Sequence, residues 1–327
     1  MRGTTSFNRG SASTLPAESS KAPQVLKSPR KRACILRERK TKFVDIFRTT
    51  PTNTVCPNFY VLAHANGCLF RPQCEYCYLR SSFWYLQAQQ AFTNIGKMER
   101  QIAAWIARDD LESYILNTGN LSDSLSFEGV RPLIARLVEV FRRRAEGAGR
   151  KHTLLLVTKG GTREYGSLLG QEPCRNVIVS FSVNSPAAAR RYERGAAPVE
   201  QRLSAAETLK AKGWRIRLRI DPMILGFDYT WVATRARHIG PERVTLGSLR
   251  AEPNLPRFVE NGLFADLEAP GDGRGLARYP KERRLALYRQ ATEQLRGVCP
   301  IGLCEETPDI WDALGLDTAA KSCNCGS

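Results

Sequence analysis

Six short apolar runs, which alternate with helical patterns, constrain the fold of this chain more than any other feature. The runs span residues 60–65, 113–117, 153–158, 177–181, 215–220 and 244–249. They lie roughly 25–40 residues apart, as the strands of successive βαβ units do. Strands separated by helices pair in parallel through right-handed crossovers. We therefore predict an α/β fold with a partial (β/α)6 barrel of TIM type. Only six runs have strand character, so a closed eight-stranded barrel is not expected.

Helical patterns fill the intervals between the expected strands. Apolar positions recur near helical spacing within residues 81–107, 130–145, 198–212, 229–238 and 280–296. Pro198 suits the first turn of its helix, and Gly213 suits the stop after it. The glycine-rich residues 271–275 do not follow a strand and open a helix. We therefore expect a flexible loop there and not a phosphate-binding loop.

The chain of 327 residues is strongly basic, with a net charge of +17. Residues 1–43 alone contain eleven Lys or Arg against two Glu. This balance favours polyanionic partners, nucleic acid first, with a merely solvated basic surface as the alternative. No run of eighteen apolar residues and no apolar signal segment occurs, so we expect a cytoplasmic protein without membrane association. The Ser- and Arg-rich start is also compatible with a transit peptide.

Composition divides the chain into three regions. Residues 1–45 are rich in Ser, Thr, Pro, Lys and Arg, which predicts a disordered basic tail. Residues 46–300 contain the strands and helices of the expected barrel. Residues 301–327 form a C-terminal tail that contains cysteine.

Three cysteines follow the first expected strand directly. Cys68, Cys74 and Cys77 have the spacing C-x5-C-x2-C, and chemistry in barrels lies at the carboxyl ends of strands. Thiolates are the usual ligands of iron–sulfur clusters, and three ligands leave one iron of a four-iron cluster open. Two alternatives stay open: a zinc site with His64 as fourth ligand, and plain buried cysteines. Ten cysteines without a signal peptide favour metal or redox chemistry over disulfides.

The residues around these cysteines resemble a known family. Asn-Gly-Cys at 66–68 and Cys-Glu-Tyr-Cys-Tyr-Leu at 74–79 are similar to the radical S-adenosylmethionine (radical SAM) superfamily, and within it to the spore photoproduct lyase-like branch of DNA repair enzymes. The later stretches that support this resemblance are residues 117–123, 155–159 and 180–184, then Glu193, Pro198, Arg202, Asp221 and Pro222. The resemblance covers roughly residues 55–310, and it implies a barrel of radical SAM type.

The resemblance also implies cofactors and site residues. Cys68, Cys74 and Cys77 would bind a [4Fe–4S] cluster, and S-adenosylmethionine would bind beside it. The residues implied to contact S-adenosylmethionine are Tyr76 at the adenine, Asn120 and Ser122 near the amino group, and Lys159 and Ser182 at the carboxylate and ribose. The alternatives are ordinary packing for Tyr76, a solvated loop lysine for Lys159, and a helix N-cap for the neighbouring Asp123.

Two departures from the family pattern bear on function. The superfamily's usual spacing is C-x3-C-x2-C, so this loop is two residues longer. Spore photoproduct lyase has a hydrogen-donating cysteine where this chain has Asn120, and an amide cannot replace a thiol in that role. The catalytic donor is therefore unassigned, and Cys174 is a candidate without further support.

The sequence thus predicts a radical SAM, lyase-like enzyme that cleaves S-adenosylmethionine to a 5′-deoxyadenosyl radical. DNA or another nucleic acid is the favoured substrate, and a flavodoxin or ferredoxin would be the reductant. The alternative is a zinc-stabilised nucleic-acid-binding protein without radical chemistry. Four further cysteines, Cys299, Cys304, Cys323 and Cys325, suit either a second metal site or a free tail with reduced thiols. We expect residues 319–327 to be mobile, which favours the free tail.

Overall fold

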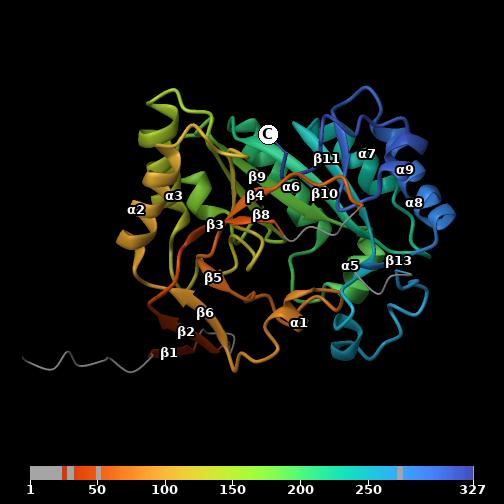
Figure 1. Cartoon of the computed structure of the whole chain (residues 1–327), viewed down its shortest axis with the longest axis horizontal. Helices are drawn as coiled ribbons and strands as arrows, with labels where there is room; N and C mark the ends of the chain where they lie inside the picture. Colours follow the sequence, from red (N-terminus) through yellow and green to blue (C-terminus); the bar gives the residue numbers. More distant parts are fainter. Residues whose placement is uncertain (1–23, 28–32, 49–52, 271–274, 327) are drawn as a thin grey trace, which may run out of the picture.

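A sheet of eight strands forms the centre of the protein (Figure 1). The computed structural model describes residues 24–27, 33–48, 53–270 and 275–326. The strands in sheet order are β3 (Val44–Phe47), β4 (Phe59–Leu62), β7 (Ile115–Asn117), β8 (Thr153–Thr158), β9 (Val177–Val183), β10 (Arg215–Met223), β11 (Arg243–Ser248) and β14 (Ile301–Leu303). Neighbours from β4 to β14 pair in parallel, whereas β3 runs antiparallel to β4.

The six expected strands are confirmed as β4, β7, β8, β9, β10 and β11. β14 adds a seventh parallel strand, and β3 adds an antiparallel edge. Both are short, which is why neither has a clear strand pattern in the sequence. Within the described residues β3 and β14 each pair on one side only, so the barrel is open, as predicted.

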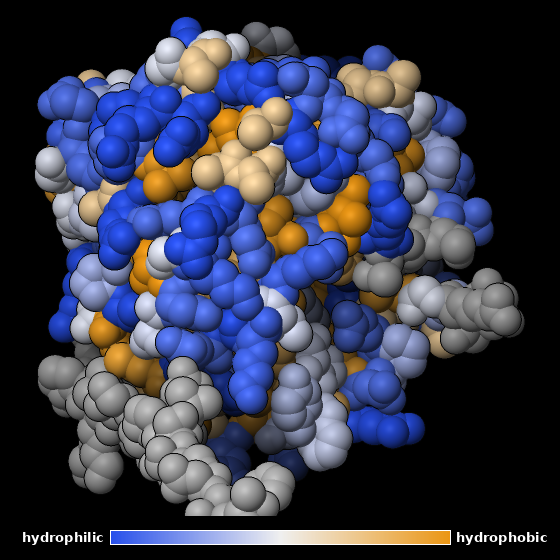
Figure 2. Space-filling view, turned by 60° about the vertical axis from the view of Figure 1, so that its left-hand side comes forward, coloured by the Kyte–Doolittle hydropathy of each residue, from blue (hydrophilic) through white to orange (hydrophobic). Residues whose placement is uncertain are grey.

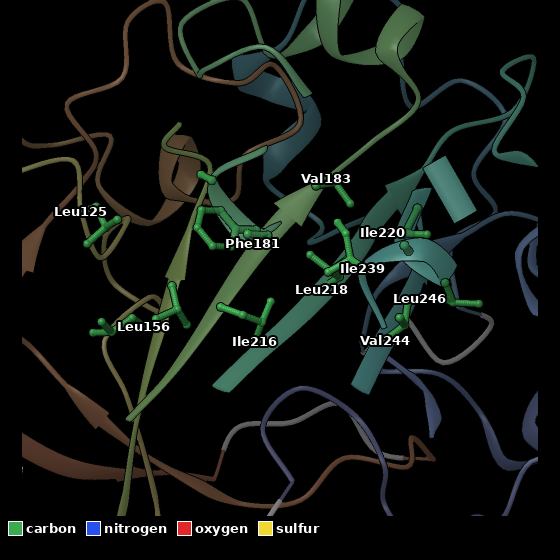
Figure 3. Close-up of a cluster of buried hydrophobic side chains, with 14 of the residues drawn as sticks. Leu125, Leu156, Phe181, Val183, Ile216, Leu218, Ile220, Ile239, Val244 and Leu246 are labelled. Carbon is green, nitrogen blue, oxygen red and sulfur yellow. The ribbon is translucent and has the colours of Figure 1, made fainter. Parts of the chain in front are cut away.

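Alternate side chains of the central strands face two different environments. Leu154 and Leu156 lie in the main core with the helices, whereas Leu155 and Val157 lie in a separate cluster with Ile115 and Ile178. This division follows from the two-residue period of a strand. Figure 3 shows Leu156, Phe181, Leu218 and Leu246 of neighbouring strands together with Ile239 from a covering helix. The sheet therefore has a helix-covered outer face and a distinct inner face.

Helices of three or more turns largely follow the predicted intervals. They are α2 (Ile95–Ile106), α6 (Val199–Ala211), α7 (Thr230–Ile239) and α8 (Lys281–Leu295), with the shorter α3 (Ile134–Phe141) continued by a π-helical turn, η1 (Arg142–Glu146). The other helical segments are α1 (Leu79–Ser82), α4 (Gly166–Leu169), α5 (Pro186–Tyr192), α9 (Pro308–Ala313) and a 3-10 turn, η2 (Leu255–Phe258). Pro198 directly precedes α6, and Gly213 follows it with a φ of +104°. Gly213 has its predicted role, whereas Pro198 lies one residue before its predicted place in the first turn, at the N-cap of α6.

The prediction of one long helix over residues 81–107 is wrong. A strand, β6 (Gln89–Phe92), separates α1 from α2. It pairs with β2 (Ala33–Arg37) in parallel and with β5 (Ala65–Asn66) antiparallel, in a second sheet completed by β1 (Gln24–Lys27). Both partners of β6 lie far away in the sequence, so the local apolar spacing does not reveal this pairing.

The expected disorder of residues 1–45 does not hold for their last part. Cys34 is 1% exposed and Phe43 is fully buried, and β2 and β3 both belong to sheets. Pairing with β6 and β4 compensates for the basic composition that predicts disorder. Residues 1–23 and 28–32 lie outside the described residues, as do residues 271–274 of the glycine-rich loop.

The C-terminal segment is also more ordered than expected. β14 joins the main sheet and α9 follows it. Cys323 is 4% exposed and Asn324 is 2% exposed, so the expectation of a free, mobile tail is wrong for these residues. The remaining pair of short strands is β12 (Arg250–Ala251) with β13 (Ala277–Arg278).

The described helices include none that is long and apolar enough to span a bilayer. The face shown in Figure 2 is largely hydrophilic and carries only separated apolar areas.

Candidate functional site

The cysteine loop leaves the barrel just after β4 and β5, at the carboxyl edge of the parallel strands. The Gly67 N–H donates a hydrogen bond of 2.9 Å to the Leu121 carbonyl. Gly67 has a φ of +85°, and a Cβ there would lie 2.7 Å from Gln89 Cγ, so a larger residue does not fit. The loop is thereby attached to residues 118–122, which follow β7 at the same edge.

The three thiols of this loop lie near one another. Each of Cys68, Cys74 and Cys77 is electrostatically coupled to at least one of the other two. Burial raises the pKa of Cys68 to about 12 and raises the pKa of Cys74 and of Cys77 as well. The thiols are therefore protonated at neutral pH until a cation or metal stabilises the thiolates.

The backbone of the loop is held by a neighbouring arginine. Arg80 donates to the carbonyl of Cys74 (2.8 Å) and to that of Gln73 (2.6 Å). Among the described residues, no three His, Cys, Asp or Glu side chains are already arranged around a common point as metal ligands. The thiols would therefore rotate toward one another when they ligate a metal.

A buried carboxylate, Glu193, organises the polar groups beside the loop. Its carboxylate forms ion pairs with Arg202 Nη1 (2.5 Å) and Lys159 Nζ (3.6 Å), and neither Glu193 nor Arg202 is more than 2% exposed. It also accepts hydrogen bonds from the Tyr76 hydroxyl and from Asn184 Nδ2 (3.0 Å). Burial opposes its ionisation, but the charges of Arg202 and Lys159 lower the pKa of Glu193 to about 2. Glu193 is thus an anion at neutral pH.

Lys159 connects this carboxylate to the cysteine loop. Its ammonium lies 5.7 Å from the centre of the Tyr76 ring and is electrostatically coupled to Cys74. Tyr76 and Lys159, both predicted site residues, are therefore brought together next to one of the thiols. Ser182 is linked to Glu193 through Arg202. Arg202 pairs with Glu193 and donates a 3.0 Å hydrogen bond to the Ser182 carbonyl.

Ser122 has a different set of contacts. Its hydroxyl lies 2.8 Å from His64 Nε2 and donates to the Thr118 carbonyl (3.3 Å). Arg131 Nη2 lies 2.8 Å from the other ring nitrogen of His64. Burial, with the Arg131 charge, lowers the pKa of His64 to about 3, so the ring is neutral. Both ring nitrogens are occupied, which argues against His64 as the fourth ligand of a zinc ion.

The remaining predicted residue, Asn120, lies on the same loop. Its carbonyl accepts a hydrogen bond from the Tyr78 hydroxyl, which ties it to the cysteine loop through backbone rather than through its amide. The adjacent Asp123 accepts hydrogen bonds from the Lys159 N–H (2.7 Å) and the Thr158 hydroxyl (2.9 Å). No helix begins at Asp123. It therefore joins the loops after β7 and β8 and does not cap a helix.

Sequence reasoning missed how the charged residues of the site are paired. Glu193, Arg202 and Asp221 stand out in the sequence only as parts of the resemblance. In the structure Asp221 pairs with Arg219 and with Arg250 (2.9 Å) at the end of β10. These acidic residues and their basic partners have no fixed spacing in the sequence and give no periodic signal, so only their burial in the structure reveals the pairs.

Gly195 brings the backbone after α5 into contact with the cysteine loop. A Cβ there would lie 2.2 Å from the Pro72 carbonyl oxygen and 2.6 Å from the Arg71 nitrogen. Gly195→Ala should therefore displace the loop and destabilise the fold by about 1–3 kcal/mol. Iron bound after anaerobic reconstitution should fall together with the melting temperature.

Gly129→Ala is the matched control for this prediction, since a Cβ at Gly129 meets nothing within 4 Å and its φ is not positive. Equal iron content in Gly195→Ala and Gly129→Ala would show that the loop does not depend on this close contact.

The fold and the site together define a class of protein. An open α/β barrel whose first parallel strand leads into a loop with three cysteines is the arrangement of a radical SAM protein. Comparison with known proteins narrows this class. The family model for spore photoproduct lyase matches residues 18–236. The chain belongs to the spore photoproduct lyase family, which is part of the radical SAM superfamily.

Individual relatives are distant. The spore photoproduct lyase of Clostridium acetobutylicum is 21% identical over 188 residues, which cover 57% of this chain and 53% of that protein. This chain therefore spans about half the length of its curated relative. Solved structures of spore photoproduct lyase mutants share the fold. One has a TM-score of 0.67 at 18% identity, and another, with bound AdoMet and dinucleoside spore photoproduct, has 0.65 at 17%. Each comparison covers 84% of this chain and 82% of the other.

Proposed function

We propose that this chain is a radical SAM enzyme whose [4Fe–4S] cluster is held by Cys68, Cys74 and Cys77. The observation that carries the proposal is the position of three coupled thiols in one loop at the carboxyl edge of the barrel. When bound, the cluster supplies the electron that cleaves S-adenosylmethionine to a 5′-deoxyadenosyl radical. Three thiolates with no fourth protein ligand suit a cluster that keeps one iron open for this molecule.

The neighbouring charges fit S-adenosylmethionine. The Lys159 ammonium lies 5.7 Å from the centre of the Tyr76 ring and acts electrostatically on Cys74, so it can bind a carboxylate and also stabilise a nearby thiolate. The Glu193 carboxylate forms an ion pair with this ammonium and thereby fixes its position. The Tyr76 hydroxyl is fixed by Glu193, so its ring is oriented for contact with the adenine.

The other proposed contacts follow from the same arrangement. Arg202 donates a hydrogen bond to the backbone carbonyl of Ser182 and so fixes this residue. A fixed Ser182 suits a contact to the ribose. Ser122 already donates to a carbonyl, so we assign the contact to the amino group primarily to Asn120 and its loop, with Ser122 in a supporting position.

We infer a nucleic-acid substrate and lyase-type chemistry. The net charge of +17 favours a polyanion, and solved spore photoproduct lyases are complexed with a dinucleoside spore photoproduct. Asn120 also borders a cavity of about 430 Å³ that Arg39 and Lys42 line, and both side chains suit phosphates. Because Asn120 carries no thiol, a group other than residue 120 must return a hydrogen atom to the product. The electron would come from a flavodoxin or ferredoxin.

Anaerobic reconstitution tests the enzyme directly. The protein should bind iron and sulfide that are absent from a variant with Cys68, Cys74 and Cys77 all changed to Ala. With dithionite and S-adenosylmethionine it should form 5′-deoxyadenosine, measured by chromatography. Zinc without sulfide at these three cysteines would overturn the proposal and favour a zinc-stabilised nucleic-acid-binding protein.

The substrate needs a separate measurement. The reconstituted enzyme should convert the thymine photoproduct in UV-irradiated DNA back to thymidine within the strand, above the level of the Cys-to-Ala variant. If 5′-deoxyadenosine forms but no photoproduct is converted, the radical chemistry stands and photoproduct repair is rejected.

A further inference from the structure

Four cysteines outside the proposed cluster site come together from three distant segments. Cys56 precedes β4, Cys304 directly follows β14, and Cys323 and Cys325 belong to the C-terminal segment. None of the four forms a disulfide. The set differs from the four cysteines that the sequence suggested, since Cys56 takes the place of Cys299, which packs against the main core.

Backbone contacts hold the three segments side by side. The N–H of Val55 donates a 2.8 Å hydrogen bond to the Glu306 carbonyl, two residues after Cys304. A Cβ at Gly302 would lie 2.0 Å from the Ser322 carbonyl oxygen and 2.5 Å from the Cys323 nitrogen. The C-terminal segment therefore lies directly on β14, beside Cys304.

Side chains from the inner face of the sheet anchor the C-terminal segment. Arg217 Nη1 donates to the carbonyls of Asn324 (2.6 Å) and Gly326 (2.8 Å), and Arg243 donates to the Cys323 carbonyl (2.8 Å). Ser180 donates to Asn324 Oδ1 (2.8 Å). These contacts come from β9, β10 and β11, so three strands fix the segment that carries two of the thiols.

The four thiols lie close enough for their charges to interact. The neighbouring thiol of Cys323, together with burial and the charges of Cys304 and Cys325, raises the pKa of Cys56. Cys325 packs on the inner apolar cluster of the sheet. The four thiols are therefore brought into one region beside β14 and the inner face of the sheet.

Nitrogen donors point at two of these sulfur atoms. Arg250 Nη2 lies 3.1 Å and Arg219 Nη2 lies 3.4 Å from Cys304 Sγ, and Asn117 Nδ2 lies 3.6 Å from Cys325 Sγ. N–H groups that donate to sulfur stabilise thiolates and tune the metal that these thiolates bind. The two arginines also bring positive charge to the thiolates, part of which Asp221 and Glu305 already neutralise.

We propose that Cys56, Cys304, Cys323 and Cys325 form a second metal centre, a four-thiolate site that takes Zn²⁺ or an iron–sulfur cluster. Four cysteine ligands are the set that both kinds of centre use. In a single-ion site with Zn–S distances of about 2.3 Å, the four sulfur atoms would lie about 3.8 Å from one another. Because no three potential ligands of the described residues already surround a common point, the four side chains would rotate to complete the ligation, and each thiol would release its proton when it binds.

The test removes the first site so that only the second can hold metal. The variant with Cys68, Cys74 and Cys77 changed to Ala is purified anaerobically, and its zinc, iron and sulfide are measured. We expect about one zinc ion, or iron together with sulfide, per chain. Adding Cys304→Ser and Cys323→Ser should remove this metal, whereas adding Cys34→Ser and Cys174→Ser, two other buried cysteines, should leave it in place.

A second measurement uses the wild-type protein and needs no variant to fold. The four thiols should resist alkylation by N-ethylmaleimide until a chelator is added, as read by peptide mass spectrometry. Protection by metal supports the site, with zinc and iron distinguished by the metal assay. The proposal would be overturned by any one of three results. These are a triple variant without metal, alkylation that is equally fast with and without chelator, and a Cys56–Cys323 disulfide in protein kept anaerobic. None of these results depends on 5′-deoxyadenosine formation. The proposal of a second metal site can therefore be rejected while the proposed enzyme activity stands, and the enzyme activity can be rejected while the second site stands.

Discussion

Cys77→Ala should lower 5′-deoxyadenosine formation with dithionite by at least about 100-fold. Loss of a residue that merely orients a metal ligand already lowers metal affinity or activity by about 10–100-fold, and Cys77 is proposed as a ligand itself. Arg80 and Lys159 act on this thiol electrostatically, so its removal should also take away the thiolate that they stabilise. The measurement is the rate of 5′-deoxyadenosine release from the anaerobically reconstituted protein.

Cys174→Ala is the matched control for Cys77→Ala. Cys174 is 1% exposed and packs in the main core, so its loss tests the effect of removing a buried thiol as such. Equal rates in the two variants would refute the assignment of the cluster ligands. Circular dichroism of both variants checks that the fold persists.

Glu193→Gln should destabilise the protein by about 3–5 kcal/mol, since it leaves the buried Arg202 and the half-buried Lys159 without their counter-charge. The amide also cannot replace the ion pairs that orient Lys159 beside Cys74. Urea unfolding at pH 7 measures the loss. The exposed pair Arg235–Glu207 provides the control, because Glu207→Gln should change stability by less than about 1 kcal/mol.

The pH dependence of this effect has a definite sign. The pKa of Glu193 is lowered from 4.5 to about 2 in the folded protein, so its ionic stabilisation is complete above pH 4.5 and is lost as the pH falls toward 2. The stability difference between wild type and Glu193→Gln should therefore shrink below about pH 4.5. A difference that stays constant down to pH 3 would mean that the carboxylate charge is not what stabilises the fold.

The parallel sheet was predictable from sequence because its strands are nearly continuous apolar runs. β8 and β9 are buried along their whole length, so each appears as a block of branched apolar residues between turns. β14 has three residues and β6 depends on β2, so neither has a local signal. The same limit explains the wrong long helix over residues 81–107.

The candidate site was predictable to a different extent. Cys68, Cys74 and Cys77 are adjacent in sequence, so their proximity follows from covalent connection. The pairing of Glu193 with Lys159 and Arg202, and the meeting of Cys56 with Cys323, depend on which strands are neighbours. Such contacts become visible only when the sheet order is known.

The sheet order has a consequence for how the chain assembles during synthesis. From β4 to β14 each parallel strand lies beside the one that precedes it in the sequence. A nascent chain can therefore extend the sheet strand by strand as it leaves the ribosome, since every new strand finds its partner already made. The segment that carries Cys323 and Cys325 follows β14 in the sequence and contacts the inner face. It lies near Cys56, which precedes the first parallel strand, so this part of the interior closes only after the parallel strands have paired.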